Sequence, residues 1–361
     1  MEGRSSRRRA KKRRRVVLFV IEILVLLIAL GVLLVVLKLD KADTGNKESV
    51  INAAVNEEVA EQVESEDNSW KMSGYKNIAL FGVDSREDGN LDKGARTDTI
   101  IVASLDNETG DIKLCSVFRD TYLNIGNDIY NKANSAYHQG GPEQAIQMLN
   151  SNLDMDITDY ITVNFRALVD TIDDLGGVEI DIMQEEIHFL NDYQIGTAEA
   201  IGIPQSQIVN VTSPGMQTLN GLQATSYCRI RYTKGDDFKR AERQRMVLTQ
   251  IADKAKASDV STLNDIIDDI LPKVKTSFTK AELVEYAARA AGMNIAEQSG
   301  FPFERVTGNM GKAGSSVVAD DFANNVVEFH AFLFGDSEYT PSQTVLDISS
   351  KVHSDRVKNG L

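Results

Sequence analysis

The chain has 361 residues, a formal net charge of −14, 42% hydrophobic residues and 25% charged residues. These proportions are typical of a globular protein with one large domain or two small ones. A domain this acidic excludes a general nucleic-acid-binding surface, which would be basic, so any anionic ligand has to be bound at a local patch.

The N-terminal region predicts a membrane anchor. Residues 1–15 contain nine Arg or Lys and a single Glu, and residues 16–37 form the apolar run VVLFVIEILVLLIALGVLLVVL. A run of this length crosses a bilayer core as one helix, and the basic tail before it is expected to stay in the cytoplasm. We therefore predict a single-pass cell-membrane protein with a cytoplasmic N-terminus, an extracytoplasmic stalk at residues 38–74 and a folded domain beyond it.

The folded domain is predicted to span residues 75–335. Runs of apolar residues, separated by turn sequences such as NETG, indicate buried strands. The second and third of these strands flank that turn, so we expect them to pair antiparallel. The strands are expected at residues 76–83, 97–106, 111–120, 159–165 and 178–182.

Helices are predicted between and after these strands. A helical stretch at residues 131–153 is interrupted by Gly-Gly-Pro, and a second at 166–177 ends in glycine. Asn220 and Asp237 are placed as N-caps of two further helices. More helices are expected through about Ala291. The last helix is expected at residues 317–335, after which the tail 336–361 is predicted to be loose, and residues 184–214 are predicted to be irregular.

This order of elements predicts an α/β fold, in which a central mixed sheet with antiparallel pairs is covered by helices. The stretch GNMGKAGSS at residues 308–316 does not have the glycine spacing of a phosphate-binding loop, because Val306 stands where the first glycine should be.

Five arginines lie between Cys228 and Arg245, in the sequence CRIRYTKGDDFKRAERQR. In the predicted helix, Arg240, Arg243 and Gln244 have the spacing of one face. Arg229 and Arg231 would point to the same side of an extended chain. Guanidinium groups bind phosphate oxygens in pairs and stay charged, so the segment predicts a site for a group with more than one phosphate. The alternative is a solvated helix face on which these arginines pair with neighbouring acids.

Charged residues also follow or precede three of the predicted strands. Asp84 follows the first strand, Arg96 and Asp98 stand at the start of the second, and Arg119 and Asp120 end the third. Antiparallel pairing would bring these ends to one rim of the sheet. Two carboxylates beside arginines suit a Mg²⁺ ion that is bound jointly by the protein and by phosphate oxygens.

The segments GVDSR, ARTDT, SVFRDTY, NKANSAY, VDTIDDLGGVEIDI and CRIRYTKGDDFKRAERQR, in this order behind one apolar span, resemble the LytR-CpsA-Psr family. The resemblance implies a phosphotransferase of the Gram-positive envelope. Such an enzyme moves a glycopolymer, for example wall teichoic acid or capsular polysaccharide, from undecaprenyl pyrophosphate to peptidoglycan. The acceptor implied is the C6 hydroxyl of N-acetylmuramic acid, and the product is a phosphodiester.

The resemblance also implies roles for individual residues. Phe118 and Lys239 depart from the family's pattern, since proline and glycine are usual at these two positions. The implied metal ligands, for Mg²⁺ or Mn²⁺, are Asp84 and Asp98. The implied catalytic residues are Asp98, Arg119, Asp237 and Arg240. The implied pyrophosphate-binding residues are Arg96, Arg119, Arg229, Arg231, Arg240 and Gln244.

Family members hold the polyprenyl chain in an apolar tunnel, and the helical stretches 142–153 and 165–175 are apolar enough to line one, although the same pattern fits an ordinary core. The transferred polymer, the catalytic base and the oligomeric state stay open. A non-catalytic sensor of polyprenyl pyrophosphates is the alternative function, and pyrophosphate hydrolysis is a third. Cys115 and Cys228 are predicted to lie near each other, with a disulfide between them left open.

Overall fold

The computed structural model describes residues 43–44, 55–64, 71–84, 91–92, 94–231, 236–259, 262, 266–267 and 270–361. The basic tail and the apolar run at 16–37 lie outside these residues, so the membrane anchor stays a prediction. Among the residues that are described, no helix is both long enough and apolar enough to span a bilayer.

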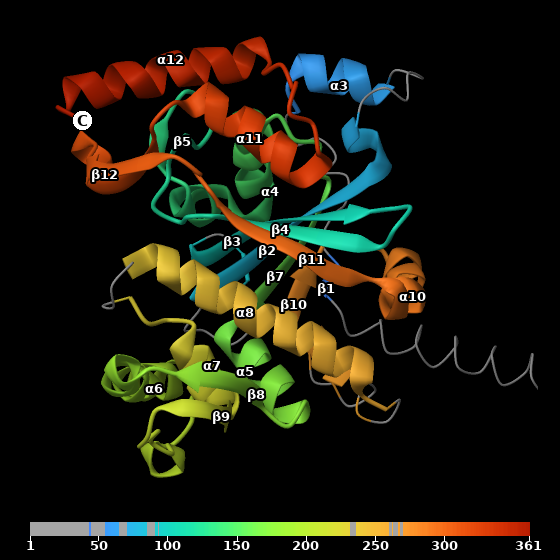
Figure 1. The fold of residues 1–361 in the computed structure, drawn as a ribbon, viewed down its shortest axis with the longest axis vertical. Coiled ribbons are helices and arrows are strands. Elements are labelled where there is room, and N and C mark those ends of the chain that lie inside the picture. Colours follow the sequence, from blue (N-terminus) through green and yellow to red (C-terminus); the bar gives the residue numbers. More distant parts are fainter. Residues whose placement is uncertain are drawn as a thin grey trace, which may run out of the picture.

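A mixed sheet of seven strands forms the centre of the molecule (Figure 1). The pairs β1–β10, β7–β2 and β4–β11 are parallel, and the other three pairs are antiparallel. The predicted α/β fold with a mixed sheet is therefore confirmed. In spatial order the strands are β1 (Asp43–Thr44), β10 (Val274–Thr276), β7 (Asp159–Asn164), β2 (Tyr75–Asp84), β3 (Arg96–Asp106), β4 (Asp111–Val117) and β11 (Asn294–Phe301).

The central strands are apolar on both faces, which is why helices cover both sides of the sheet. In β3, Ile100 and Val102 point into one hydrophobic cluster, whereas Ile101 and Ala103 point into another on the opposite face. Successive side chains of a strand alternate between faces, so a continuous apolar run requires two cores.

The first face is covered by helices from three distant parts of the chain, as Figure 1 shows. They share one large hydrophobic cluster with the sheet. The predicted Gly-Gly-Pro break is present in the first of them, because Gly140 and Gly141 leave helical geometry. The helices are α3 (Glu57–Glu64), α4 (Asn134–Leu153), α11 (Phe322–Phe334) and α12 (Gln343–Lys358).

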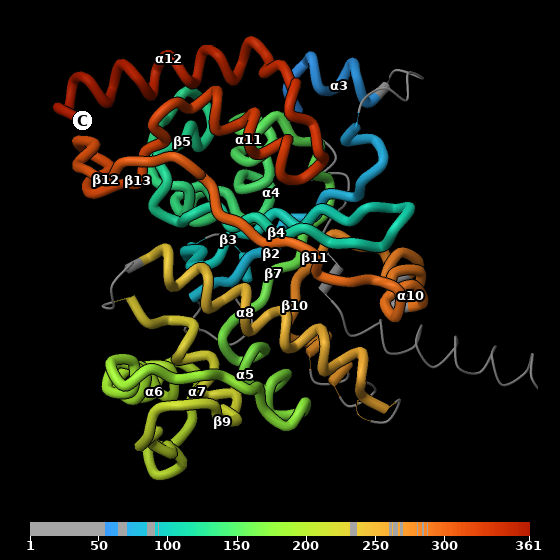
Figure 2. Tube along the Cα trace, in the orientation of Figure 1, coloured from blue at the N-terminus to red at the C-terminus, as the bar shows by residue number. Residues whose placement is uncertain are grey.

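The second face carries the other helical layer and a small lobe, which can be followed along the chain in Figure 2. Helices α5 (Phe165–Asp174), α7 (Gly221–Tyr227) and α8 (Asp236–Ala257) lie on this side. The lobe has a cluster of its own and consists of the antiparallel pair β8 (Val178–Ile182) and β9 (Gly215–Leu219) together with α6 (Ile187–Ala200).

The prediction that residues 184–214 are irregular is wrong, because α6 occupies nearly half of them. The side chains that this helix buries include Leu190, Gln194, Thr197 and Ala198. Their spacing is helical, but two of the four are polar, so the stripe lacks the apolar signal that marks an amphipathic helix.

The prediction of a loose tail after residue 335 is also wrong, because α12 packs on the first core through Val345, Ile348 and Val352. Its N-cap is tied to the domain by the buried carboxylate of Asp154. That carboxylate accepts hydrogen bonds from the main-chain amide (2.8 Å) and the hydroxyl (2.6 Å) of Ser342. It also accepts one from the side-chain amide of Asn56 (2.5 Å). Part of the predicted stalk and the tail are thus joined at one point.

Several short elements were not predicted. Four strands lie between residues 274 and 319. One of them, β10, lies where helices were expected up to about Ala291, and another overlaps the start of the helix predicted at 317–335, which begins at Phe322. The glycine-rich stretch near Gly311 is the turn of an antiparallel pair, β12 (Arg305–Asn309) and β13 (Ser315–Ala319). The remaining elements are the pair β5 (Tyr122–Asn124) and β6 (Tyr130–Lys132), and the helix α10 (Lys280–Arg289).

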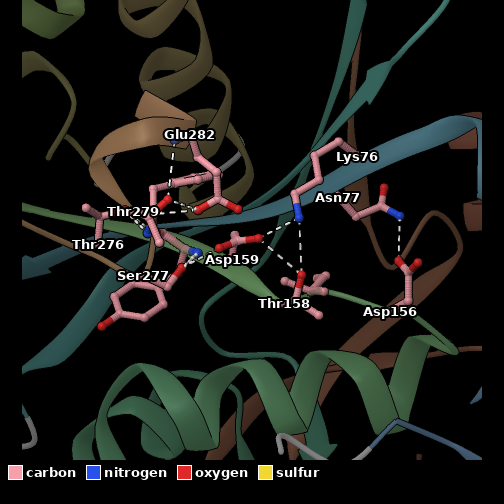
Figure 3. A network of polar contacts seen from close by, with 12 residues as sticks. Lys76, Asn77, Asp156, Thr158, Asp159, Thr276, Ser277, Thr279 and Glu282 are labelled. Atoms are coloured by element: carbon pink, nitrogen blue, oxygen red, sulfur yellow. Dashed lines mark hydrogen bonds and ion pairs between the residues drawn. The ribbon is translucent and has the colours of Figure 1, made fainter. Parts of the chain in front are cut away.

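A buried polar network joins the strands at one side of the sheet (Figure 3). The carboxylate of Asp159, on β7, lies 2.5 Å from the ammonium of Lys76 on β2 and accepts a hydrogen bond from the Ser277 hydroxyl (2.9 Å). The same hydroxyl accepts a hydrogen bond from the Tyr160 amide at 3.0 Å. Because Asp159 is fully buried, its charge depends on these partners.

Candidate active site

The predicted rim of charged residues is present. Strands β2 and β4 end where β3 begins, so Asp84, Asp98 and Arg119 lie at the same end of three adjacent strands. The register shifts between Gly82 and Val83, and this bulge leaves Asp98 without a backbone partner on β2. Bulges change the direction of a side chain at a sheet edge, which here separates Asp98 from the regular ladder.

Arg119 is surrounded by acids. Its guanidinium forms a hydrogen-bonded ion pair with Asp98 and lies 3.8 Å from Asp120 and 3.7 Å from Asp237. Burial alone would lower the pKa of Arg119, but the three carboxylates outweigh it and raise this pKa above its ordinary value. Arg119 therefore stays positively charged at the centre of the rim.

The first turn of α8 completes the cluster from the other side. Asp237 is ion-paired with Arg240 (3.0 Å) and with Arg231 (3.3 Å). Burial raises the pKa of the Asp237 carboxyl above its usual range, and Arg240 and Arg119 limit the rise. The helix begins at Asp236, so Asp237 stands in its first turn rather than at the predicted N-cap, and its carboxylate contacts arginines instead.

Arg229 differs from the other arginines of the cluster. Its guanidinium donates a hydrogen bond to the Thr197 hydroxyl (2.8 Å) and lies over the rings of Phe165 (4.6 Å) and Tyr193 (5.6 Å). Among the described residues, no acid forms an ion pair with it. The predicted extended chain at residues 229–231 is wrong, because Cys228 and Arg229 continue the turns of α7. Arg229 is therefore held in place while its charge is left for a ligand.

A cavity of about 380 Å³ begins at these charged residues and continues between the sheet, α5 and α8. Its charged end is formed by Asp98, Arg229 and Arg240. The rest of its wall is mainly apolar and includes Leu80, Ile101, Ile161, Val163, Phe165, Leu168, Val247, Leu248 and Ile251. Such a space fits an amphiphile with an anionic head and a hydrocarbon chain.

Only one of the two predicted tunnel segments lines this cavity. Phe165 and Leu168 of α5 are part of its wall. The stretch 142–153 is not, since Ile146, Met148 and Leu149 of α4 are buried in the hydrophobic core on the opposite face of the sheet. Apolar helical spacing does not indicate which face of a sheet a helix covers.

The remaining predicted residues differ in placement. Gln244 lines the cavity and its amide donates to the Cys228 carbonyl at 3.4 Å. Arg96 pairs with Asp84 through the backbone, but its side chain is exposed and forms no ion pair with the described acids of the cluster. Arg243, predicted to share the face of Arg240, forms a buried ion pair with Glu186 at 2.7 Å.

The two predicted metal ligands, Asp84 and Asp98, differ in how their carboxylates are engaged. One oxygen of Asp84, Oδ1, is buried and accepts no hydrogen bond from any described residue. A carboxylate oxygen in this state fits a hard cation such as Mg²⁺. Asp98 is engaged by Arg119, and within the described part of the chain no three acidic, histidine or cysteine side chains form a metal-binding group. The residues thus fit a cation only if a ligand's oxygens complete its shell.

The two cysteines are separate and free. Cys115 belongs to the core on the α4 side of the sheet and Cys228 to the lobe, so the prediction that they lie close together is wrong. Burial raises the pKa of both thiols to about 12, so neither is a thiolate at neutral pH.

Sequence reasoning assigned no role to several residues that hold the cluster together. Asp120 links Lys132 (3.1 Å) to Arg119, and Glu186 fixes Arg243. Asp120 and Lys132 both lie in segments that carry the resemblance, SVFRDTY and NKANSAY, which was the available signal. No comparable signal pointed to Thr197 or Tyr193, because the helix that carries them was not predicted.

The model of the LytR_cpsA_psr family matches residues 37–324, and the chain belongs to this family. The chain is 30% identical over 213 residues to the polyisoprenyl-teichoic acid–peptidoglycan teichoic acid transferase TagU of Enterococcus faecalis. This match covers 58% of this chain and 64% of the relative, which is slightly less than two thirds of the relative's length. It is 26% identical to the corresponding transferase TagT of Bacillus subtilis, over 68% of this chain and 72% of the relative.

The fold is also similar to that of solved structures. One is the LytR-CPS2A-psr family protein YwtF (TagT) with bound octaprenyl pyrophosphate lipid. The likeness has a TM-score of 0.52 at 17% sequence identity and covers 83% of this chain and 96% of that chain. At this identity the comparison shows a common fold.

Proposed function

We propose that this protein is a phosphotransferase that moves a glycopolymer from a polyprenyl pyrophosphate carrier to peptidoglycan. One observation carries the proposal: charged arginines and acids stand at the mouth of a mainly apolar cavity, and one of these arginines, Arg229, forms no ion pair with any acid that the structure describes. This combination suits a lipid pyrophosphate, whose chain is apolar and whose head is a dianion or more. The relatives named as teichoic acid transferases support the same class of donor and acceptor.

In this proposal the lipid chain occupies the apolar part of the cavity and the pyrophosphate lies at its charged end. Arg229 is available to bind phosphate oxygens because no acid in the described part of the chain has to be displaced from it. Arg119 and Arg240 both contact Asp98, at the charged end of the cavity, and neutralise charge that develops on the leaving lipid phosphate.

The acceptor is the hydroxyl of a peptidoglycan sugar, and we assign it to the C6 hydroxyl of N-acetylmuramic acid. Its oxygen forms a bond to the phosphorus that carries the glycan, and the bond from that phosphorus to the lipid phosphate breaks. We assign the proton of the hydroxyl to Asp237, because burial raises the pKa of this carboxyl and its Oδ1 accepts no hydrogen bond from a described residue.

Asp84 and Asp98 would hold Mg²⁺ together with phosphate oxygens of the donor. When bound, the ion supplies charge neutralisation for the pyrophosphate. The two acids would otherwise repel that dianion, which is the physical reason for placing a cation there. We further propose that the apolar run at residues 16–37 anchors the protein in the cell membrane, with residues 75–335 on the outer side, where both substrates are present.

The proposal is tested by incubating the full-length protein in detergent with a polyprenyl-pyrophosphate glycan, Mg²⁺ and peptidoglycan fragments. A glycan joined to the fragments through a phosphodiester, detected by mass spectrometry, is the expected product. Asp84→Asn should abolish the dependence of donor binding on Mg²⁺ in calorimetry. Tight donor binding with no product under any metal condition would instead support a non-catalytic sensor, and free glycan phosphate would support hydrolysis.

A further inference from the structure

Helix α8 separates two spaces. The side chains of Arg240, Gln244, Val247 and Ile251 line the apolar cavity. The opposite face of the same helix borders a groove of about 570 Å³, which is bounded on its other side by β11 and by the segment before β12. The spacing of the two sets follows from 3.6 residues per turn, which places them on opposite sides of the helix. From α8, the groove is lined by Phe238, Lys239, Glu242 and Arg245.

The groove begins at the charged cluster. Phe118, in its wall, directly precedes Arg119, and Phe238 directly follows Asp237. The two rings meet edge to face at 4.7 Å, and the guanidinium of Arg305 lies 4.0 Å from the centre of one and 4.9 Å from the centre of the other. Phe118 stands where the family usually has proline, and its ring thus helps to position the guanidinium of Arg305.

The groove carries uncompensated positive charge. Arg305 donates hydrogen bonds to the carbonyls of Pro302 and Phe303, each at 2.8 Å, and forms no ion pair with any acid of the described residues. Arg245 donates to the Ser116 hydroxyl at 2.7 Å and keeps its Nε buried without a hydrogen-bond partner. Arg245 likewise has no ion pair within the described chain. The acid of the groove, Glu242, is paired with Lys239 at 2.8 Å.

The position of the groove indicates which ligand it meets. In phosphoryl transfer the attacking and leaving oxygens lie roughly in line. If the lipid phosphate leaves toward the cavity on one side of α8, the acceptor hydroxyl approaches from the opposite side, where the groove lies. The acceptor therefore has to be a polymer that brings anionic groups alongside its reacting hydroxyl.

We propose that this groove binds the peptidoglycan acceptor, with Arg305 and Arg245 binding the free carboxylates of its stem peptides. The proposal rests on the proposed function, because it assigns the acceptor of that reaction. Guanidinium groups pair with carboxylates through two parallel hydrogen bonds, and neither arginine is ion-paired with a carboxylate of the residues that the structure describes. Arg305 is held by two rings and two carbonyls, so little side-chain freedom is lost on binding.

The test uses full-length protein in detergent and soluble peptidoglycan strands of two kinds, one with free stem-peptide carboxylates and one with these groups amidated. Binding of each strand is measured by calorimetry, and transfer kinetics give KM for the strand and KM for the lipid-linked donor. The variants are Arg305→Gln and Arg245→Gln. Arg289→Gln is the control, because that arginine lies on α10, outside the groove, with Glu285 as its partner at 3.8 Å.

Each groove variant is expected to raise Kd and KM for the carboxylate strand about tenfold, which corresponds to about 1.4 kcal/mol. Kd for the amidated strand should already be high and should not rise further. KM for the donor should equal that of the wild type. Arg245→Gln provides an independent measurement if the loss of Arg305 disturbs the rings of Phe118 and Phe238, which circular dichroism in the aromatic region would reveal.

Unchanged strand binding in both variants would overturn the assignment. A rise in KM for the donor with an unchanged KM for the strand would also overturn it, because this result would place the anionic polymer of the donor in the groove. These outcomes differ from failure of the proposed function. Suppose that the wild-type protein forms no phosphodiester and that the Arg305 and Arg245 variants bind the carboxylate strand more weakly than the wild type. The groove assignment then holds and the proposed transfer reaction is wrong.

Discussion

Arg240 is hydrogen-bonded to the main chain of Asp98, because its Nη2 donates to the Asp98 carbonyl oxygen at 3.1 Å. The same nitrogen lies 3.0 Å from the carboxylate of Asp237. The side chain is only 4% exposed, so it joins the first turn of α8 to the bulge of β3 inside the protein. The guanidinium group of Arg240 therefore helps to set the distance between the helix and the rim.

We expect Arg240→Lys to lower kcat for transfer by at least about tenfold although the positive charge is retained. A lysine ammonium is a single point of contact and cannot reproduce the planar fork of arginine. Kinetics with saturating donor measure this loss. A variant that transfers glycan at the wild-type rate would show that the bond between α8 and β3 is not needed for the reaction.

Arg229→Ala is expected to lower kcat/KM for the donor about a hundredfold, or about 3 kcal/mol, because it removes a charged hydrogen-bonding partner of the phosphates. Since Arg229 has no acidic partner among the described residues, its loss leaves no buried acid unpaired. The thermal midpoint should therefore stay close to that of the wild type. A large fall in stability accompanied by normal turnover would make Arg229 a structural residue.

The rate of transfer should depend on the ionisation of Asp237. Burial raises the pKa of this carboxyl, and a proton acceptor works only when ionised. The rate should therefore fall as the pH drops through that raised pKa, at a higher pH than an ordinary aspartate with a pKa of about 3.9 would give. Asp237→Asn should remove this acidic limb from the pH profile and leave a low, flat rate. Persistence of the limb in the variant would assign the proton to another group.

Lys76→Met is expected to destabilise the fold by about 3 kcal/mol, because it leaves the fully buried carboxylate of Asp159 without its cation. Lys351 offers a matched control. Its ammonium lies 2.5 Å from the carboxylate of Asp355, the same distance as between Lys76 and Asp159, but the Lys351 side chain is 44% exposed. Lys351→Met should cost less than about 1 kcal/mol. Urea unfolding of the two variants measures the difference, and equal effects would contradict the role assigned to burial.

The fold should lose stability in mild acid through His330. Its ring is buried against Tyr339 (3.6 Å between ring centres), and burial lowers its pKa from 6.5 to about 4. Between these values the unfolded chain binds a proton that the folded chain does not. The free energy of unfolding should thus fall as the pH drops from 6.5 toward 4, by about 3 kcal/mol at most from this group.

His330→Gln should show a shallower decline over the same pH range in urea unfolding, even if it is less stable at pH 7. An identical slope in the variant and the wild type would assign the acid sensitivity to other groups.

The charged rim was predictable because its residues flank strands with strong apolar runs. Asp84, Asp98 and Arg119 needed only antiparallel pairing of neighbouring strands, which the short turn NETG made the simplest arrangement. The helix α8 was predictable for a similar reason, although the placement of Asp237 in its first turn was not, because ion pairs with three arginines compete with a capping role.

The elements that were not predicted are those stabilised by long-range contacts. Strand β11 has mostly exposed or half-buried residues and exists through parallel pairing with β4, about 180 positions earlier in the chain. Helix α12 buries only Val345, Ile348 and Val352. Its N-terminus is fixed by Asp154, which no local pattern around Ser342 reveals. Arg305 could not be connected with Phe118 from the sequence, because their contact depends on the β4–β11 pairing.

The two faces of α8 have a consequence for how this chain can vary in length. A helix turns by about 100° for each residue, so inserting or deleting one residue near Arg243 would rotate everything after it by that angle. Val247 and Ile251 would leave the wall of the apolar cavity while Arg240 kept its place. A single substitution in this helix changes one side chain on one face. An insertion or deletion would instead replace part of the apolar wall of the cavity by charged side chains. Natural variants of this protein should therefore accept insertions in surface turns, such as the one at Gly311, and keep α8 at constant length between its first turn and Ile251.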